Sequence, residues 1–295
     1  MKKKRRLIAI GDVHGDLHYA QSALRLAKVL DSENKWIGDD TIVIQTGDQL
    51  DRYRGYPIKK KDDQDDMLVL DFFDDLNQQA RRKKGKVISL CGNHEIYQCL
   101  GDMSYVSPAG FLHFGRTKEQ GKQARIRAFS PGQKEAKRLA RTRPAFVFVE
   151  DWLFGHAGMT PAIMKQLQIH NRKDLETLNK TLKLWLMGKE TNMSHEKLEL
   201  IFGDRTLGEL NTDNENTEKE EEEETCSRNV NPVLMMLKIK GIVVGHTIQE
   251  QGITSACNQK VYRIDTGSSA AFKPFLKSVS PQVLEIVDNR VTILS

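Results

Sequence analysis

The sequence of 295 residues lacks any apolar run long enough to cross a membrane. Its basic start at 2–6 is followed by only four apolar residues, 7–10, which is too short for the hydrophobic region of a signal peptide. We therefore expect a soluble, cytoplasmic protein with no membrane contact and a solvated basic tail over 1–6. A nuclear-localisation role for the basic run stays open as an alternative.

Cysteine is scarce as well. The sequence contains four cysteines, and their spacing does not resemble that of a zinc finger (Cys91, Cys99, Cys226 and Cys257). Disulfide frameworks belong mainly to small secreted domains that cannot build a sufficient hydrophobic core. For a cytoplasmic chain of this length we therefore predict a fold that does not depend on a disulfide framework.

Nucleic-acid motifs are a third absence. The chain has a net charge of +5, and 212–224 alone contains eight acidic residues against one lysine, so the remainder has a net charge of +12. A basic body suits phosphorylated or otherwise acidic partners. Because no basic stripe interleaved with aromatic residues accompanies this charge, we expect no nucleic-acid partner. We predict that the acidic stretch, 212–225, is a disordered insertion.

The composition that remains is ordinary for a globular protein, with 39% hydrophobic and 29% charged residues. Short apolar runs alternate with helical patterns, and hairpin patterns follow late in the chain. We predict strands at 7–10, 42–45, 86–90, 146–149, 152–154 and 242–244, hairpins at 253–264 and 283–294, and helices at 17–30, 67–77, 162–200 and 233–238. This order indicates an α/β fold with mixed sheets, layered or sandwiched, and helices outside. We predict one domain over 1–295, with a cap of loops and short helices over 101–144.

The stretch 42–52 contains the most informative turn. A buried strand, 42–45, ends at Gly47, and the turn then supplies Asp48, Asp51 and Arg52. Functional sites collect at the carboxyl ends of strands in α/β sheets. Two carboxylates so close together would repel one another unless a cation or a histidine lay between them.

Four further predicted strands end in similar turns beside glycine. Together the five turns supply Asp12, His14, Asp48, Asp51, Arg52, Asn93, His94, His156 and His246. A single histidine after a strand is more often structural, but four of the eight histidines lie in these turns. Oxygen and imidazole donors without thiolates favour manganese, iron or zinc. The four histidines, the strand-end aspartates Asp12 and Asp48, and Asn93 make seven donors, which exceed the needs of one ion. The sequence therefore predicts two divalent metal ions that share a bridging carboxylate.

In order along the chain, the five turns resemble the motifs of the calcineurin-like metallophosphoesterases. They read Gly-Asp-Val-His-Gly (11–15), Gly-Asp-Gln-Leu-Asp-Arg (47–52), Gly-Asn-His-Glu (92–95), Gly-His-Ala-Gly (155–158) and Gly-His-Thr (245–247). The third motif is similar to that of the phosphoprotein phosphatases within the superfamily. Two further segments, 101–106 and 264–267, resemble the bacterial-type branch, the Shewanella-like phosphatases. The resemblance covers nearly the whole chain and implies the same fold, with a dinuclear metal site at strand-end loops.

The resemblance also implies two ligand sets. One metal ion would be held by Asp12, His14 and Asp48, and the other by Asp48, Asn93, His156 and His246. Asp48 would therefore be the bridging carboxylate, and manganese is the metal that we expect first, with iron or zinc as alternatives. A hydroxide between the two ions would attack phosphorus in line.

Further residues of the motifs would act on the substrate. His94 would donate a proton to the leaving oxygen, and Asp51 would orient His94. The substrate phosphate would be bound by Arg52, Asn93 and Arg205. Arg205 follows from a second arginine that the family supplies before the last helix, although Phe202 stands where the family has tryptophan.

The expected activity is hydrolysis of phosphate monoesters on Ser, Thr or Tyr side chains of phosphorylated proteins or peptides. One alternative is a dinucleoside-tetraphosphate hydrolase, whose third motif commonly ends in Asp where this chain has Glu95. A second alternative, from another class, is an inactive phosphatase fold that binds phosphoproteins as a scaffold. The presence of every expected ligand and of His94 argues against it.

Overall fold

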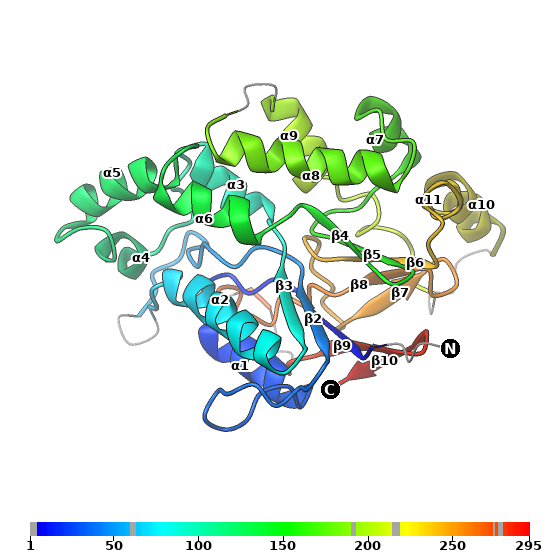
Figure 1. Cartoon of the computed structure of the whole chain (residues 1–295), viewed down its shortest axis with the longest axis horizontal. Helices are drawn as coiled ribbons and strands as arrows, with labels where there is room; N and C mark the ends of the chain where they lie inside the picture. The colour runs from blue at the N-terminus through cyan, green and yellow to red at the C-terminus, as the bar shows by residue number, and fades with distance from the viewer. Residues whose placement is uncertain (1–4, 60–62, 190–192, 214–218, 274, 277–279) are drawn as a thin grey trace.

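The computed structural model describes residues 5–59, 63–189, 193–213, 219–273, 275–276 and 280–295. Two five-stranded sheets form its centre (Figure 1). The first sheet has the order β10-β9-β1-β2-β3 and the second the order β4-β5-β6-β8-β7. Both sheets are mixed. In the first, β1, β2 and β3 are parallel, and β9 and β10 pair antiparallel on one side of them. In the second, β5, β6 and β8 are parallel, and the antiparallel strands β4 and β7 flank them.

The strands are short and mostly buried. Those of the first sheet are β1 (Leu7–Ile10), β2 (Ile42–Gln45), β3 (Lys86–Ser89), β9 (Val283–Val287) and β10 (Arg290–Leu294). Those of the second are β4 (Phe146–Val149), β5 (Trp152–Gly155), β6 (Gly241–Val244), β7 (Thr254–Ala256) and β8 (Val261–Arg263). Both predicted hairpin regions are antiparallel pairs, β7 with β8 and β9 with β10.

The two sheets pack face to face. Successive side chains of a strand point to opposite faces, so each strand can bury one set of side chains between the sheets and another under the helices. In β1, Leu7 and Ala9 belong to the cluster between the sheets, whereas Ile8 and Ile10 belong to the cluster under the helices. In β6, Val243 faces the other sheet. The predicted sandwich of mixed sheets is therefore the observed arrangement.

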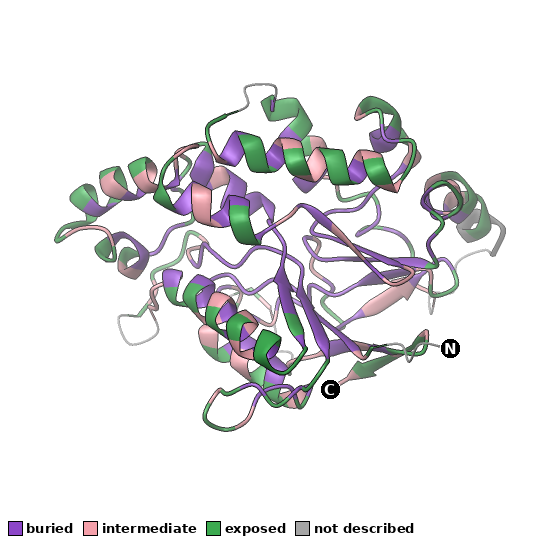
Figure 2. Ribbon diagram, viewed as in Figure 1, coloured by how far each residue is buried: buried purple, intermediate pink, exposed green. Residues whose placement is uncertain are grey.

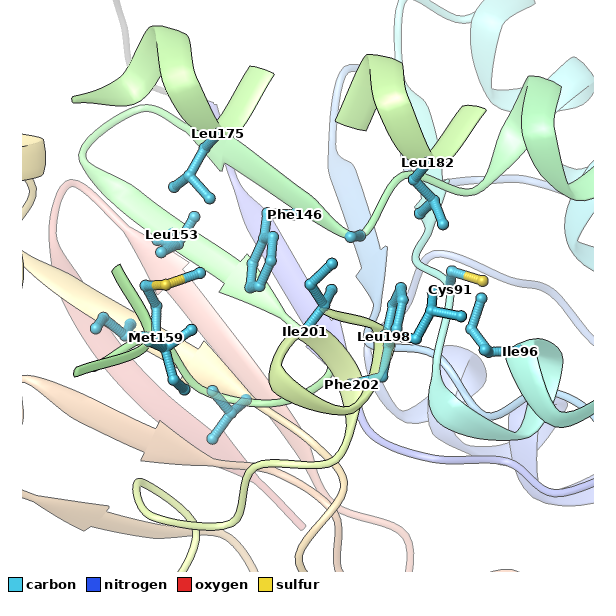
Figure 3. Close-up of a cluster of buried hydrophobic side chains, with 14 of the residues drawn as sticks. Cys91, Ile96, Phe146, Leu153, Met159, Leu175, Leu182, Leu198, Ile201 and Phe202 are labelled. Atoms are coloured by element: carbon cyan, nitrogen blue, oxygen red, sulfur yellow. The ribbon is translucent and has the colours of Figure 1, made fainter. Parts of the chain in front are cut away.

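Helices cover the outer faces of both sheets. α1 (Leu17–Leu26) and α2 (Met67–Arg82) cover the first sheet, with their buried sides turned towards it (Figure 2). α7 (Pro161–Gln166), α8 (Arg172–Leu186) and α9 (His195–Phe202) lie over the second sheet. There Phe146 and Leu153 contribute to one cluster with Leu175, Leu182 and Ile201 (Figure 3).

The predicted cap consists of helices in the structure. After α3 (Asn93–Cys99), the region contains α4 (Pro108–Leu112), α5 (Lys118–Phe129) and α6 (Lys134–Thr142), which extend to one side of the sheets (Figure 1). The stretch 162–200 is mostly helical, as predicted, and contains three helices with separate N-caps, Thr160, Asn171 and Ser194. Each cap accepts a hydrogen bond from the first turn of its helix, which starts a new helix there.

Two features near the acidic run were not predicted from the sequence. The insertion that we predicted to be disordered is helical from Lys219, where α10 (Lys219–Asn229) begins. α11 (Asn231–Leu237) follows it, and residues 214–218 lie outside the described part. Cys226 and Cys257 form a disulfide, with Cα atoms 5.4 Å apart. The sequence did not reveal this bond because 31 residues separate the two cysteines and only folding brings them together.

Within the described residues, no helix has the length and apolar content to cross a membrane. The described part of the basic tail contacts the first sheet. Nε of Arg6 donates to Oε1 of Glu285 on β9 at 2.6 Å.

Candidate metal centre

Five strand ends bring polar side chains to one place between the sheets. Asp12 and His14 follow β1, Asp48 follows β2, and Asn93 begins α3 after β3. β1, β2 and β3 are parallel, so their carboxyl ends lie at the same edge of the first sheet. β5 and β6 are parallel too, and the turns that follow them carry the histidines His156 and His246 from the second sheet.

One cluster of donors forms around His156. Its Nε2 lies 2.7 Å from Oδ1 of Asn93, 3.1 Å from Nδ1 of His246 and 3.5 Å from Oδ2 of Asp48. All four side chains are buried. These are the four residues expected to hold one metal ion, and the structure brings them together.

A second cluster forms on the other side of Asp48. Nε2 of His14 lies 3.7 Å from Oδ2 of Asp48 and 4.0 Å from Oδ2 of Asp12. Nε2 of His94 lies 3.9 Å from the same Asp48 oxygen. His94 therefore stands closer to the centre than the sequence suggested, whereas Asp12 reaches both clusters, with Oδ1 3.8 Å from Nδ1 of His156. Asp48 is the residue that the two clusters share.

The second ring nitrogen of each histidine has a partner of its own, and the type of partner differs between His94 and the other three. The outer ring nitrogens of His14, His156 and His246 lie 3.3, 2.9 and 3.2 Å from the backbone oxygens of Leu50, Thr46 and Gly203. A carbonyl can only accept, so Nδ1 of His156 and Nε2 of His246 carry the proton, and their inner nitrogens keep a lone pair for a metal ion. Nδ1 of His14 also lies 2.6 Å from Nη2 of Arg54, which can only donate. His94 differs, because its Nδ1 lies 2.9 Å from a carboxylate oxygen of Asp51.

The backbone is unusual at four of these residues. His14, Asp48, Asp51 and His246 have φ between 47° and 67°, a region that costs energy for residues with a side chain. The turns also need their glycines, because a Cβ on Gly92 would lie 2.2 Å from Oδ1 of Asp48. The carboxylate therefore occupies the space that any other residue at 92 would fill.

The electrostatics of the cluster fit divalent cations. Oδ1 of Asp12 is buried and has no hydrogen-bond partner among the described residues. Burial, together with the nearby carboxylates of Asp265 and Asp48, raises the pKa of Asp12 well above its usual range. Burial likewise lowers the pKa of His156 and His246 to about 3, so both are neutral. Crowded carboxylates and neutral imidazoles are the donor set that a pair of divalent ions would satisfy.

A cavity of 310 Å³ opens over the cluster. It is lined by His14, Asp48, Arg54, Asn93, His94, Tyr97, Tyr105, Arg205, His246, Ile248, Asp265 and Phe272. Two arginines, two tyrosines and a phenylalanine therefore surround the metal-binding side chains. A cavity of this composition suits an anionic group that carries an apolar or aromatic portion.

Comparison with known proteins gives the family. The model of the calcineurin-like phosphoesterase family matches residues 5–250. The chain belongs to this family. The predicted family, fold class and phosphoesterase activity are thereby confirmed, and the chain is a hydrolase of the metallophosphoesterase type.

Among related metallophosphoesterases, the chain is 28% identical to "Shewanella-like protein phosphatase 2" of Arabidopsis thaliana, over 97% of its own length and 76% of that protein. It is 29% identical to "Shewanella-like protein phosphatase 1" of Plasmodium berghei, over 90% of its own length and 67% of that protein. The solved structure of the cold-active protein-tyrosine phosphatase of a psychrophilic Shewanella species has a TM-score of 0.68. That likeness covers 98% of this chain and 77% of the other at 22% identity, so it shows a shared fold.

In this metallophosphoesterase, Glu95 organises the central turn. Its carboxylate accepts hydrogen bonds from the backbone N–H groups of Asp48, Gln49, Leu50 and Gly92, at 2.8–3.0 Å. Burial and the charge of Asp48 raise the pKa of Glu95 to about 7, while the N–H groups of Gly92 and Leu50 act in the opposite direction. Glu95 thus fixes the turn that presents Asp48, as a structural residue.

The sequence did not reveal a set of residues behind His94. Oδ1 of Asp51 accepts a hydrogen bond of 2.6 Å from Nε2 of Gln98, and Oε1 of Gln98 accepts one of 2.6 Å from Nε of Arg125. Arg125 on α5 is fully buried and donates twice to Asp66, whose Oδ2 also accepts from the backbone N–H of Asp51. Arg125 of the cap therefore supports Asp51 indirectly, through Gln98 at its side chain and through Asp66 at its backbone. These residues carry no local pattern that could have identified them.

The two arginines predicted to bind phosphate have different positions relative to the cavity. Arg205 lines the cavity, and its Nη1 donates to the backbone oxygen of His246 at 2.8 Å. Arg52 is buried, donates to the backbone oxygen of Gly15 at 3.2 Å, and is not among the described residues that line the cavity. Arg54 lines the cavity instead. The sequence did not single out Arg54 because it lies two residues beyond the recognised motif.

Proposed function

We propose that this metallophosphoesterase is a protein phosphatase that hydrolyses phosphate monoesters on protein side chains. The observation that carries the proposal is the pairing of His94 with Asp51 at 2.9 Å, beside two clusters of metal-binding donors. A carboxylate partner favours the imidazolium form of a histidine, so the pairing with Asp51 suits His94 to proton transfer. The names of the related Shewanella-like phosphatases are consistent with the same activity.

Two divalent ions, with manganese as our first choice, would be held by Asp12, His14 and Asp48 on one side and by Asp48, Asn93, His156 and His246 on the other. When bound, they would supply Lewis-acid activation of water and of the phosphoryl oxygens. The chain itself supplies the proton for the leaving oxygen, from Nε2 of His94, while Nδ1 stays bonded to Asp51.

The protonation of His94 depends on the substrate. Burial lowers the pKa of His94 to about 4, the nearby carboxylate of Asp48 acts against this, and the positive charge of Arg54 lowers it further. A phosphate dianion in the cavity would offset the arginine and raise this pKa, because a nearby negative charge favours the imidazolium. His94 would therefore gain its proton as the substrate binds.

The rim of the cavity favours an aromatic phosphate ester. Tyr97 and Tyr105 are nearly parallel, with ring centroids 6.2 Å apart, and Tyr105 meets His94 edge-on at 4.8 Å. Phe272 also lines the cavity, with its ring centroid 5.1 Å from that of His14. Aromatic pairs gain roughly 0.5–1.5 kcal/mol beyond their buried area. We therefore expect phosphotyrosine to be preferred over phosphoserine and phosphothreonine.

The test is an assay of metal-stripped protein reloaded with manganese. Phosphate release is measured from matched phosphotyrosine and phosphothreonine peptides and from a dinucleoside tetraphosphate, with His94→Asn protein as the control for contaminating phosphatases. We expect manganese-dependent release from peptides, faster with phosphotyrosine.

Each other outcome selects a different function. Turnover of the dinucleotide alone would replace the protein phosphatase with a nucleotide hydrolase. A protein that binds phosphopeptide, binds no metal and does not hydrolyse the peptide would be a scaffold.

A further inference from the structure

Exposed aromatic side chains are concentrated in one region of the molecule. In the described part of the chain, Tyr56, Tyr105 and Phe275 are 51%, 36% and 50% exposed, and every other Phe, Tyr and Trp is less exposed. Tyr105 lines the cavity over the metal-binding side chains. Single exposed apolar side chains are normal on a protein surface, whereas a group of them marks an interaction site. The positions of the other two relative to the cavity therefore decide whether the three form such a group.

Tyr56 and Phe275, the outer aromatic pair, contact each other. Their rings meet edge-on, with centroids 4.6 Å apart. An edge-to-face arrangement is favourable for two aromatic rings, so the contact holds both side chains in place. Each ring nevertheless leaves about half of its area in water. The outer aromatic pair is therefore a preformed apolar surface that remains open to a ligand.

Short links join the outer aromatic pair to the cavity. The backbone N–H of Phe275 donates to the backbone oxygen of Phe272 at 2.8 Å, which closes a turn, and Phe272 lines the cavity. On the other strand of this connection, Tyr56 follows Arg54 by two residues. The guanidinium carbon of Arg54 lies 4.8 Å from the ring centroid of Phe272 and 5.4 Å from that of Tyr105. The aromatic surface is therefore continuous from the rim of the cavity to the outer aromatic pair.

The size of the outer aromatic pair suits a single side chain of a bound peptide. A Phe or Tyr side chain can bury about 150–250 Å², so two half-exposed rings offer roughly 200 Å². A stable interface with a second folded protein takes about 800 Å² from each partner. The pair is thus too small to dock a second copy of this chain by itself, but large enough to cover one leucine or phenylalanine.

We propose that the outer aromatic pair binds an apolar side chain of the phosphopeptide substrate, roughly two to four residues from the phosphorylated one. This inference rests on the proposed function, since it names the sequence that the same site would select. The first and fourth Cα atoms of a turn are less than about 7 Å apart, so Phe275 lies within that distance of Phe272 at the cavity. An extended peptide rises about 3.3 Å per residue, so it would cover this distance in about two residues. The phosphorylated residue itself lies deeper, which adds one or two more.

The experiment scans phosphotyrosine peptides that carry one leucine at successive positions on either side of the phosphotyrosine, in a host of glycine and serine. The value of kcat/KM is measured on manganese-loaded protein. Dissociation constants are measured by fluorescence anisotropy on His94→Asn protein, where binding needs no turnover. Both sets are repeated with Phe275→Ser and with Tyr56→Ser. The matched control is Ile37→Ser, because Ile37 is also 51% exposed but precedes β2, whose other end leads to the metal centre.

We expect leucine at one position to improve binding and kcat/KM roughly 3-fold to 10-fold over serine, the usual worth of an aromatic contact. Phe275→Ser and Tyr56→Ser should each remove most of this preference, whereas Ile37→Ser should keep it. Turnover of p-nitrophenyl phosphate, which has no flanking residues, should be the same in all three variants as in the wild type. Thermal unfolding of each variant shows that the fold persists.

The proposal is overturned if the wild type shows no preference for leucine at any position, or if both variants of the outer aromatic pair retain that preference. An equal loss of activity on p-nitrophenyl phosphate and on peptides would also overturn it, because the pair would then support the cavity itself.

This proposal and the proposed function can fail separately. Leucine-dependent binding that needs the outer aromatic pair, without hydrolysis of any peptide, would remove the proposed function and keep this assignment. Hydrolysis of peptides at rates that do not depend on leucine would do the reverse.

Discussion

The two sheets contribute different chemistry to the same centre. The first sheet supplies carboxylates, an amide, His14 and the His94–Asp51 pair, whereas β5 and β6 of the second sheet supply only imidazoles. The backbone oxygens that orient the histidines also come unequally from the two sheets. His14 is held by Leu50, from its own sheet, but His156 is held by Thr46 at the end of β2, across the interface between the sheets.

The same dependence appears at His246. Its backbone N–H donates to Oδ2 of Asp12 at 3.1 Å, so a carboxylate of the first sheet fixes the turn after β6. The half-site on the first sheet is thus largely self-supporting, whereas the half-site on the second is built on the first. The difference teaches that packing of the two sheets, more than either motif alone, creates the metal centre.

Removal of the shared carboxylate of Asp48 should weaken metal binding at both clusters. Asp48→Ala takes a donor from each cluster, and we expect metal content to fall well below that of His14→Ala or His246→Ala, which each remove a donor from one cluster only. Turnover should fall by roughly 10³–10⁵, because a metal ion contributes several kcal/mol to transition-state stabilisation. Elemental analysis and steady-state kinetics check this; equal metal content in Asp48→Ala and His246→Ala would show that the halves are independent.

Substitution of His94 should slow proton transfer to the leaving oxygen and leave both metal sites in place. For His94→Ala we expect turnover to fall by roughly 10²–10⁴, the usual contribution of general acid catalysis. Metal content should remain nearly unchanged, since neither predicted ligand set includes His94. Loss of one metal ion in this variant would mean that His94 is a ligand, as its place beside His14 and Asp48 would allow.

Metal binding should strengthen as the pH rises. In the metal-free protein, burial raises the pKa of Asp265 to about 6, and Asp48 and Arg54 act on it in opposite directions. Below that pH the carboxyl holds a proton that a nearby dication would expel, so affinity should increase between about pH 5 and 7, by up to about tenfold per pH unit for each proton released. Calorimetry in buffers of different ionisation enthalpy measures this release; an affinity independent of pH would show that no carboxyl gives up a proton.

The smallest effect should come from the support behind Asp51. Gln98→Met removes the donor to Oδ1 of Asp51 and preserves the volume of the side chain. We expect kcat to fall roughly 3-fold to 10-fold, the worth of one hydrogen bond, while KM and metal content stay close to wild type. The exposed Gln123→Met on the neighbouring helix is the control. A change in KM alone would place Gln98 in substrate binding.

The sequence revealed most of this centre because its residues follow short strands that are parallel and buried, so their turns had to converge. It missed Arg54, which stands outside the motif, and the links from Gln98 and Asp66 to Arg125, which join residues 27 and 59 positions apart. Such contacts are decided by how the cap packs, and a local pattern carries no record of that. The disulfide was not predicted for the same reason. The helix in the acidic run was not predicted because the charge of that run alone favoured disorder.

The pairing of β1 with β9 has a consequence for synthesis of the protein. The two strands are neighbours in the first sheet, yet one spans Leu7–Ile10 and the other Val283–Val287. At about 5–20 residues per second, a ribosome takes roughly 15–55 s to make the chain between them. During that interval one edge of β1 has no partner from its own sheet, so the nascent chain would expose a strand edge to neighbouring polypeptides until β9 emerges.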